Sequence, residues 1–407
     1  MKRVVVTGLG AITPVGNDIE TMWGNLTAGK HGIGPITRFD LEGYKASLAA
    51  QVKDFDPLEY LEKGEVRRLD LYSQYAIAAA TQAVKDSAIE GKIEPERFAT
   101  YFGSGIGGMV TFENEVEKLL TGGPRKVSPL FIPMMIPNLA AGNIAIRFNA
   151  KGSCTAVITA CATGTDCIGS AFRAIKHGYA DAAIAGGSEA VVTPMGVSGF
   201  SNMTALTTSS DPDNASLPFD KRRGGFVIGE GSGVIILEEY EHATRRGAKI
   251  YAEITGYGTT CDAHHITAPT PTGEASARAI SDAYKESGSP DGNVYINAHG
   301  TGTPLNDAAE TKAIKLAFED KTENILVSST KSMTGHMLGA AGAVEAIVAI
   351  LTLSKGVVPP TVGLIEPDPE CDLDYVPLKA RQVSPALAMS VSLGFGGHNA
   401  CVAFSGI

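Results

Sequence analysis

Short apolar runs recur along the whole chain, and a glycine-rich turn or an amphipathic stretch follows each of them. Clear examples are residues 182–187, 234–237, 294–296 and 325–327. The runs carry few charges, which is typical of strands buried on both faces, and the amphipathic stretches between them are typical of helices. The pattern therefore predicts an α/β fold with largely parallel sheets that are covered by helices.

The order of these elements repeats once along the chain. Four segments have counterparts in the same order further on: 3–10 with 251–258, 102–105 with 298–302, the turn at Cys161 with 328–331, and 182–187 with 389–394. This faint duplication predicts two β/α halves, residues 1–250 and 251–407. The first half is longer. We expect its surplus, roughly residues 17–98, 106–140 and 190–225, to form a cap, a pocket wall and a subunit interface.

Charge limits the classes of partner. The 407-residue chain has a formal net charge of −10, which argues against nucleic acid as a partner because phosphates demand a positive surface. An acidic partner would need a local basic patch. Three clusters are candidates: Lys63 with Arg67 and Arg68, Arg125 with Lys126, and Lys221 with Arg222 and Arg223.

Cysteine usage and hydropathy indicate the compartment. Six cysteines are scattered without a CxxC pair, which predicts a reducing, cytoplasmic location. No run approaches the roughly 20 apolar residues of a membrane span, so we expect no membrane partner. Cys261 lies near His264 and His265, but no second ligand pair follows at zinc spacing. No metal site is therefore predicted.

Cys161 is the first candidate for chemistry. It follows the apolar run 156–160 and precedes the amphipathic stretch 162–175, so the pattern predicts a strand, a sharp turn and a helix. A thiol at such a turn lies near the unpaired N–H groups and positive dipole end of the helix, which favour the thiolate. We expect Cys161 to be a nucleophile that favours its thiolate form.

Two histidines stand at the ends of other predicted strands. His299 follows the apolar run 294–296 within the segment Asn-Ala-His-Gly-Thr-Gly-Thr-Pro, and His336 follows 325–329 within Thr-Lys-Ser-Met-Thr-Gly-His. α/β proteins commonly place reacting groups at strand ends. A cysteine and two histidines at three such turns indicate one catalytic site.

These blocks resemble those of elongating β-ketoacyl-acyl carrier protein synthases, in the thiolase-like superfamily. The segments 218–231 and 394–399 (Gly-Phe-Gly-Gly-His-Asn) carry the resemblance further, so that it covers nearly the whole chain. The Cys-His-His set differs from that of initiating relatives, which pair cysteine with His and Asn. The run 359–377 resembles the type II synthase. The resemblance implies duplicated thiolase-like halves in a layered α-β-α-β-α architecture, and a homodimer.

The same resemblance implies the chemistry. Cys161 would take an acyl group from an acyl carrier protein, and malonyl-carrier protein would then bind. His299 and His336 would donate hydrogen bonds from Nε2 to the malonyl thioester carbonyl as carbon dioxide leaves. Lys331 would organise these histidines, with Glu345 in its network. The product would be a 3-oxoacyl thioester two carbons longer, as in fatty acid biosynthesis.

Further residues take binding roles by resemblance. Thr301 and Thr303 resemble residues that hydrogen-bond the phosphopantetheine of the carrier, and no permanently bound cofactor is implied. Phe395, between glycines, resembles a gate, and its backbone N–H would join that of Cys161 in holding an oxyanion. Residues 262–270 resemble a second gating loop, although His264 replaces the aromatic residue often found there. Ile106 and Phe131 resemble residues of an acyl tunnel near a dimer interface.

The sequence also allows a comparison with three other functions. Residues 103–108 fit the pattern GxGxxG, but no clear path of about 20 residues leads to a second strand that ends in an acidic residue, so nucleotide binding is disfavoured. A non-catalytic partner subunit of a polyketide synthase would share the fold but lack the nucleophilic cysteine. A catalytic ketosynthase of a type II polyketide pathway would keep the same triad and stays as the alternative.

Overall fold

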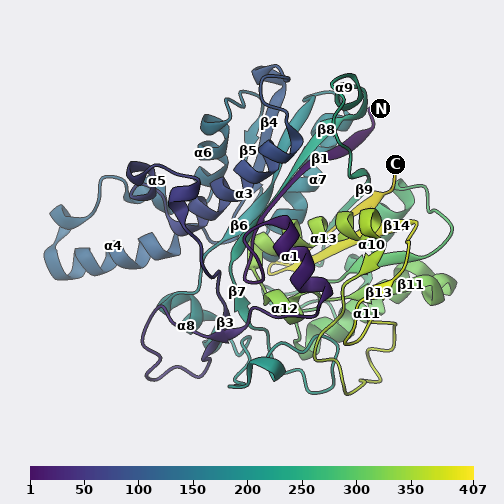
Figure 1. Cartoon of the computed structure of the whole chain (residues 1–407). Coiled ribbons are helices and arrows are strands. Elements are labelled where there is room, and N and C mark those ends of the chain that lie inside the picture. The colour runs from purple at the N-terminus through teal and green to yellow at the C-terminus, as the bar shows by residue number, and fades with distance from the viewer.

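The computed structural model describes residues 1–407, with the side chain of Asp320 excepted, and its centre is a mixed sheet of ten strands. Their order is β11-β10-β14-β15-β9-β1-β8-β6-β4-β5 (Figure 1). The strands of one side are β1 (Val4–Ile12), β4 (Phe98–Gly103), β5 (Cys154–Thr155), β6 (Ala182–Glu189) and β8 (Gly231–Glu239). Those of the other are β9 (Ala252–Cys261), β10 (Val294–Asn297), β11 (Ile325–Ser328), β14 (Leu387–Gly394) and β15 (His398–Ser405).

The strand order is symmetrical about the contact between β1 and β9. Moving outward from this contact, β8 corresponds to β15, β6 to β14, β4 to β10 and β5 to β11. Three of these correspondences join the segments whose sequences repeat, namely β1 with β9, β4 with β10 and β6 with β14. β1 and β9 pair only briefly, over 4–6 against 252–254, so the two sides are joined by a narrow seam.

Helices lie on both faces of each side of the sheet. On the first side, α3 (Leu71–Ser87) packs on β1 and β8, and on the second side α10 (Glu274–Glu286) packs on β9 and β15. Two further helices, α7 (Thr163–Lys176) and α13 (Ala341–Lys355), contact strands of both sides. Because α7 and α13 lie between the two sides of the sheet, each side counts as one β layer, and the order of layers is α-β-α-β-α. The helix α11 (Pro304–Phe318) extends the last layer beside α10. This confirms the predicted architecture.

The alternation of side chains along the strands explains the layers. Ile184 and Ile236 belong to the apolar cluster under α3, whereas Ala183, Ala185 and Ile235 belong to the cluster that holds α7 and α13. Successive residues of a strand point to opposite faces, so both faces of these strands must be apolar to be covered. One helical stretch, Leu338–Lys355, is long and apolar enough to cross a membrane, but 83% of it is buried inside the protein. It is a core helix.

The sheet is mixed, so the prediction of largely parallel strands was wrong. Only β4–β5, β4–β6, β10–β11 and β10–β14 run parallel, and the pairs nearer the seam are antiparallel. For one of these antiparallel pairs the reason is visible at residues 395–397, where a short turn joins β14 directly to β15. A tight turn of this kind makes an antiparallel pair, whereas a parallel pair needs a longer crossover.

The predicted surplus of the first half contains both core and peripheral elements. α3 falls within it but forms an outer layer of the fold, as α10 does in the second half. In contrast, α4 (Met109–Gly122) projects from the body of the molecule, with α5 (Phe131–Met135) at its base (Figure 1). The remaining longer helices are α1 (Ile19–Thr27), α6 (Leu139–Arg147), α8 (Pro194–Asn202) and α9 (Tyr240–Arg245), and short ones are α2 (Lys63–Val66) and α12 (Lys331–Thr334). Small sheets are formed by β2 (Gly34–Pro35), β3 (Leu48–Ala50) and β7 (Ile228–Gly229), and by β12 (Val357–Val358) and β13 (Arg381–Gln382).

Candidate active site

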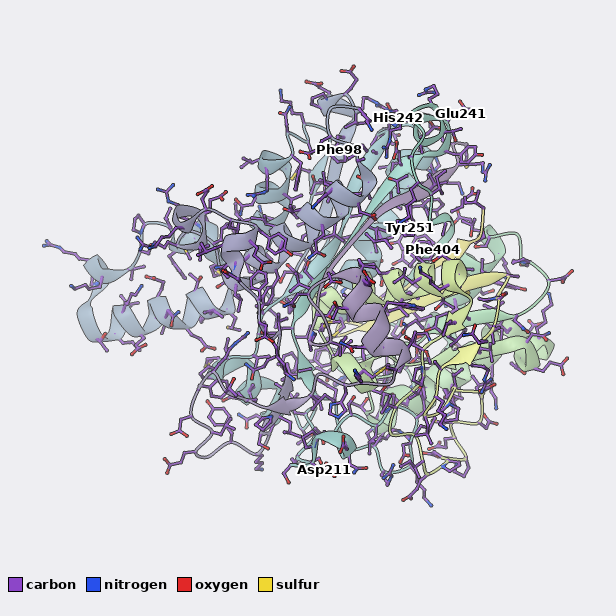
Figure 2. All side chains as sticks on the ribbon, in the orientation of Figure 1. Phe98, Asp211, Glu241, His242, Tyr251 and Phe404 are labelled. Carbon is purple, nitrogen blue, oxygen red and sulfur yellow. The ribbon has the colours of Figure 1, made fainter. Side chains whose placement is uncertain are left out.

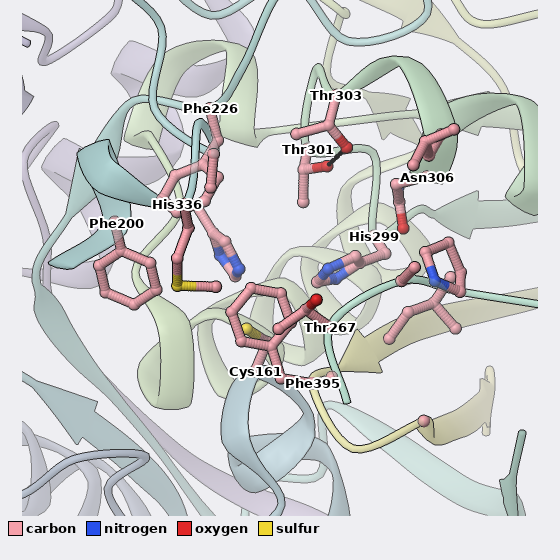
Figure 3. Close-up of a pocket in the computed structure, with 18 of the residues that line it drawn as sticks. Cys161, Phe200, Phe226, Thr267, His299, Thr301, Thr303, Asn306, His336 and Phe395 are labelled. Atoms are coloured by element: carbon pink, nitrogen blue, oxygen red, sulfur yellow. Dashed lines mark hydrogen bonds between the residues drawn. The ribbon is translucent and has the colours of Figure 1, made fainter. Parts of the chain in front are cut away.

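A cavity of about 800 Å³ opens where the turns that follow several strands of both halves meet. Cys161, His299 and His336 all line it, although they are far apart in the sequence (Figure 3). Thr301, Thr303 and Phe395 line it too. The structure thus brings together six of the residues that the sequence singles out.

Cys161 lies in a tight turn before α7, but the strand predicted over 156–160 is absent. Ala160 has a left-handed φ of 51°, and the following residues form a single 3₁₀ turn that leads into the helix. The backbone of this segment is bonded to side chains of α7 instead of a neighbouring strand: Thr159 N–H donates to Thr163 Oγ1, and the Cys167 thiol to the Val157 carbonyl. The apolar run is therefore a coil that α7 holds in place.

The turn that follows β14, in the second half of the chain, approaches Cys161 closely. A Cβ at Gly394 would lie 2.6 Å from the Thr159 carbonyl oxygen and 3.3 Å from the Cys161 nitrogen, so a larger residue does not fit. This close approach brings the backbone N–H of Phe395 to the Cys161 thiol, where the N–H of Cys161 itself also acts. Two N–H groups at one sulfur form a site for an oxyanion on a group bound there.

The environment of the thiol contradicts the expected thiolate. Burial raises the pKa of Cys161 to about 12, and the charge of Glu189 adds to the rise. The charge of Lys331 and the two backbone N–H groups act in the opposite direction but do not prevail. The thiol is 7% exposed, so loss of hydration of the thiolate outweighs the helix terminus.

The two histidines are buried and face the same space. Their ring centroids are 5.2 Å apart with an interplanar angle of 87°, and Figure 3 shows both imidazoles pointing into the cavity beside Phe395. Nδ1 of His336 accepts a hydrogen bond from the Leu338 N–H at 3.3 Å, so a neutral ring carries its proton on Nε2. Nδ1 of His299 is buried and has no partner among the described residues.

A buried ion pair stands behind the histidines. Lys331 bonds to Oε1 of Glu345, and both side chains are 1% exposed. Burial lowers the pKa of both histidines well below the usual value, and the charge of Lys331 lowers it further. Both imidazoles are therefore neutral hydrogen-bond donors near pH 7. The predicted proximity of Lys331 to Glu345 and His336 is found, while the role of this network stays a prediction.

Sequence reasoning missed two buried carboxylates that shape the site. Glu310 on α11 accepts hydrogen bonds from the N–H groups of His299 and Gly300 at 2.6 and 2.7 Å. Glu189 at the end of β6 accepts from Gly105 at 2.9 Å and from Gly339 at 3.0 Å. Burial raises the pKa of each to about 7. The available signal for Glu189 was an acidic residue inside an apolar, glycine-rich strand.

The mouth of the cavity carries the predicted binding residues. The hydroxyls of Thr301 and Thr303 bond to each other at 2.9 Å (Figure 3). Phe395 stands beside Phe200, with ring centroids 6.4 Å apart, and Phe200 is 5.6 Å from Phe226. These two neighbours were not predicted, because nothing in the segment 190–225 distinguishes Phe200 from a core residue.

The loop 262–270 forms one edge of the cavity through residues 262 and 266–269. It is tied to the Phe395 turn, because Gly396 N–H donates to the Ile266 carbonyl at 2.8 Å and Asp262 N–H to the Gly397 carbonyl at the same distance. His264 is exposed and does not line the cavity.

Ile106 and Phe131 do not line this cavity. Ile106 packs in the apolar cluster that contains Cys161, immediately behind the site. Phe131 lies on α5 against Phe112 of α4, with ring centroids 6.4 Å apart. Their assignment to an acyl tunnel stays a prediction.

Known proteins are similar to this chain over nearly its whole length. The family model described as "Beta-ketoacyl synthase, N-terminal domain" matches residues 1–243, and that of the C-terminal domain matches residues 251–364. The chain is 50% identical over 405 residues to 3-oxoacyl-[acyl-carrier-protein] synthase 2 of Staphylococcus aureus (strain COL), covering 99% of this chain and 98% of that protein. The protein of the same name from Synechocystis sp. is 50% identical over 406 residues, with the same coverage.

Solved structures agree. The ishigamide ketosynthase/chain length factor superposes with a TM-score of 0.93 at 35% identity, covering 100% of this chain and 99% of that one. A ketosynthase in complex with its type II PKS acyl-carrier protein gives 0.92 at 34% identity, with the same coverage. The chain belongs to the β-ketoacyl synthase family.

Proposed function

We propose that this protein is a 3-oxoacyl-[acyl-carrier-protein] synthase II, which elongates fatty acyl chains by decarboxylative condensation with malonyl-carrier protein. The observation that carries the proposal is the cavity in which the Cys161 thiol, two backbone N–H groups and two neutral imidazoles converge. The relatives at 50% identity are named 3-oxoacyl-[acyl-carrier-protein] synthase 2, whereas the similar polyketide ketosynthases are 34–35% identical, which favours fatty acid elongation over the polyketide alternative.

The first step is transfer of the acyl group. Sγ of Cys161 attacks the thioester carbonyl of the acyl-carrier protein, and the N–H groups of Cys161 and Phe395 stabilise the oxyanion that develops. The bond to the carrier sulfur breaks, and the carrier leaves as a free thiol with the proton that Cys161 loses. Because the pKa of this thiol is raised, its proton is lost only as the carbonyl is attacked.

The second step generates the nucleophilic carbon. The thioester carbonyl of malonyl-carrier protein accepts hydrogen bonds from Nε2 of His299 and His336, which stabilise the enolate as carbon dioxide leaves. The enolate carbon attacks the acyl carbonyl, and the bond from that carbonyl to Sγ breaks. The thiolate of Cys161 then takes a proton from solvent, and the 3-oxoacyl chain remains on the carrier.

The carrier protein is the proposed partner, and no permanently bound cofactor is proposed. The name of one similar structure describes a ketosynthase with its acyl-carrier protein. Thr301 and Thr303 stand at the mouth of the cavity, where they would bond the amides of phosphopantetheine. Lys63, Arg67 and Arg68 are exposed and lie in none of the ion pairs among the described residues, whereas Arg222 and Arg223 bind Asp220 and Asp368 internally. Arg125 and Lys126 are likewise exposed and lie outside the described ion pairs, so the first two clusters are better docking candidates than the third.

We also propose a homodimer in the cytoplasm. The helix α4 projects from the body of the molecule (Figures 1 and 2). It bears Phe112, Leu119 and Leu120, of which the last is 79% exposed. Ile146 on α6 is 80% exposed. The exposed strand β5 contacts α6 and forms the outer edge of the sheet, and an open edge favours pairing with a second copy. All six cysteines are unpaired, as expected in a reducing compartment.

The test is a condensation assay with purified protein, malonyl-carrier protein and acyl-carrier proteins of graded chain length. The expected product is the 3-oxoacyl-carrier protein two carbons longer, identified by mass spectrometry. A profile that accepts saturated acyl primers supports fatty acid synthesis. Repeated extension of unreduced 3-oxo chains would assign the protein to a polyketide pathway, and no condensation with any primer would overturn the proposal.

A further inference from the structure

Asp166 is a buried carboxylate close to the nucleophile that the proposed mechanism does not use. It lies in the first turn of α7, is 4% exposed and does not line the cavity. Oδ2 accepts a hydrogen bond from Thr159 Oγ1, and Oδ1 accepts one from Tyr257 OH, each at 2.6 Å. Such short bonds are typical of hydroxyl groups that donate to an ionised carboxylate.

The first of these bonds fixes the residue two positions before the nucleophile. Thr159 is held twice by α7, because its N–H also donates to Thr163 Oγ1 at 2.9 Å. Ala160, between Thr159 and Cys161, has a left-handed φ of 51°. Residues with a Cβ keep this conformation only when their surroundings impose it. The bonds to Thr159 supply that constraint on the side that precedes Cys161.

The second bond comes from the other half of the molecule. Tyr257 lies on β9, and its ring packs directly on α7, where a Cβ at Gly169 would lie 2.2 Å from the ring. Burial and the charge of Asp166 raise the pKa of Tyr257, so the phenol stays protonated and donates. The carboxylate is therefore held from β9 while it holds Thr159.

We propose that Asp166 is a positioning residue. Because it bonds to Tyr257 of β9 and to Thr159 at the same time, it fixes the turn of Cys161 relative to β9 and so sets the position of the thiol under the two N–H groups. This inference rests on the proposed function, in which Cys161 is the nucleophile. Both hydroxyls donate to Asp166, so the carboxylate accepts two charge-assisted hydrogen bonds. An Asn side chain could accept only one of them, and its NH₂ group would force the other hydroxyl to accept and turn its own proton away.

The test compares Asp166→Asn and Thr159→Val with the wild type. The first measurement is the rate of Cys161 alkylation by iodoacetamide, followed on the Cys161 peptide by mass spectrometry because Cys154 and Cys261 are exposed. The second is malonyl-carrier decarboxylation by each variant in the Cys161→Ala background. The third is the thermal unfolding midpoint. Thr159→Ser restores the hydroxyl and serves as the conservative rescue.

A matched control exists elsewhere in the fold. Tyr251, labelled in Figure 2, donates to Oδ2 of Asp86 on α3 at 2.7 Å, a phenol–carboxylate bond of the same kind that is remote from Cys161. Tyr251→Phe and Asp86→Asn should leave alkylation unchanged. Tyr257→Phe should lower it, and the double variant with Asp166→Asn should lose no more than Asp166→Asn alone, because both act through one carboxylate.

The expected result is a roughly tenfold slower alkylation in Asp166→Asn and Thr159→Val, with decarboxylation within about twofold of the background and with Thr159→Ser near the wild type. Wild-type alkylation rates in both variants would overturn the inference. An equal loss of alkylation and decarboxylation would also overturn it, because it indicates general destabilisation. If wild-type protein is alkylated at Cys161 yet never condenses acyl chains, the proposed function fails instead.

Discussion

The loop after β4 and the loop after β10 occupy equivalent places in the two halves, and each is clamped by one buried carboxylate. After β4, Glu189 accepts hydrogen bonds from Gly105 and Ser104, and after β10, Glu310 accepts from His299 and Gly300. The first loop presents Ile106 to the apolar cluster behind Cys161, whereas the second presents His299 to the cavity.

The difference lies in the side chains that the two loops carry. Both halves use a strand end, a tight turn and a buried acceptor to fix a loop. One half then supplies the thiol and an apolar wall, and the other supplies two neutral imidazoles and a buried lysine. In the proposed mechanism, a duplicated scaffold thus divides one reaction between its copies, with the nucleophile for acyl transfer on one and the imidazoles for enolate stabilisation on the other.

The largest expected effect is the change of reaction rate with pH, which should differ between the Cys161 thiol and the two histidines. Because the pKa of the Cys161 thiol is raised to about 12, the rate of its alkylation should rise about tenfold per pH unit, or about a thousandfold from about pH 7 to about pH 10. Decarboxylation by Cys161→Ala should show no inflection near pH 6.5, because both histidines stay neutral there. An alkylation rate that levels off near pH 8 would indicate a thiolate and reverse this part of the comparison.

The next effect is on stability, at the buried pair of the second half. Lys331→Met should lower the free energy of unfolding by about 3–5 kcal/mol near neutral pH, since it leaves Glu345 buried without its cation. In the wild type, burial raises the pKa of Glu345 and Lys331 opposes this rise. Without Lys331, the pKa of Glu345 rises further above its unfolded value of 4.5. Stability is then greatest below the unfolded pKa and falls as pH rises through the folded pKa. Chemical denaturation at several pH values measures this.

Adding Glu345→Gln to Lys331→Met is the control, because it removes the charge that burial penalises. The double variant should recover much of the lost stability, with a flatter dependence on pH. Equal stability of the single and double variants at every pH would show that the pair does not set the fold of this region.

The two buried carboxylates, Glu310 and Glu189, should affect decarboxylation and condensation to different degrees. Glu310→Gln should lower decarboxylation by roughly 30- to 100-fold in the Cys161→Ala background, because an amide cannot accept from both the His299 and Gly300 N–H groups. Glu189→Gln, its counterpart, should affect decarboxylation less and condensation more. Parallel assays of both reactions check this, and identical profiles for the two variants would contradict the division.

The smallest expected effect is on chain length. Ile106→Phe should lower condensation of the longest accepted acyl primers by about tenfold and leave the shortest nearly unchanged, because the added ring fills space behind Cys161. Competition between short and long acyl-carrier proteins measures the ratio. An unchanged ratio would remove Ile106 from the acyl pocket.

Local patterns in the sequence predict the turns well and the electrostatics poorly. Cys161, His299 and His336 each follow an apolar run and precede small residues, so their convergence at turns could be foreseen, although only His299 directly follows a strand, whereas Cys161 follows a coil and His336 follows α12. The raised pKa of Cys161 could not, because it depends on burial by segments from both halves. The coil over 156–160 was mistaken for a strand, since apolar character alone does not show that Thr163 and Cys167 satisfy its backbone.

Long-range contacts account for the other omissions. Asp166 reads as an ordinary acidic residue in the first turn of a helix, and only the fold places Tyr257 against it. Glu310 likewise resembles a surface residue of an amphipathic helix until the loop after β10 turns its N–H groups toward it. The antiparallel pairing of β14 with β15 follows from the short turn at 395–397, whose length is visible in the sequence, whereas the other antiparallel pairs join segments distant along the chain.

The most direct measurement of the central claim compares condensation and malonyl-carrier decarboxylation in wild type, Cys161→Ala and His299→Ala. We expect Cys161→Ala to lose condensation while it still releases carbon dioxide, and His299→Ala to lose both reactions. That outcome would assign acyl transfer to the first half and enolate stabilisation to the second. Condensation by Cys161→Ala, or undiminished decarboxylation by His299→Ala, would contradict the account.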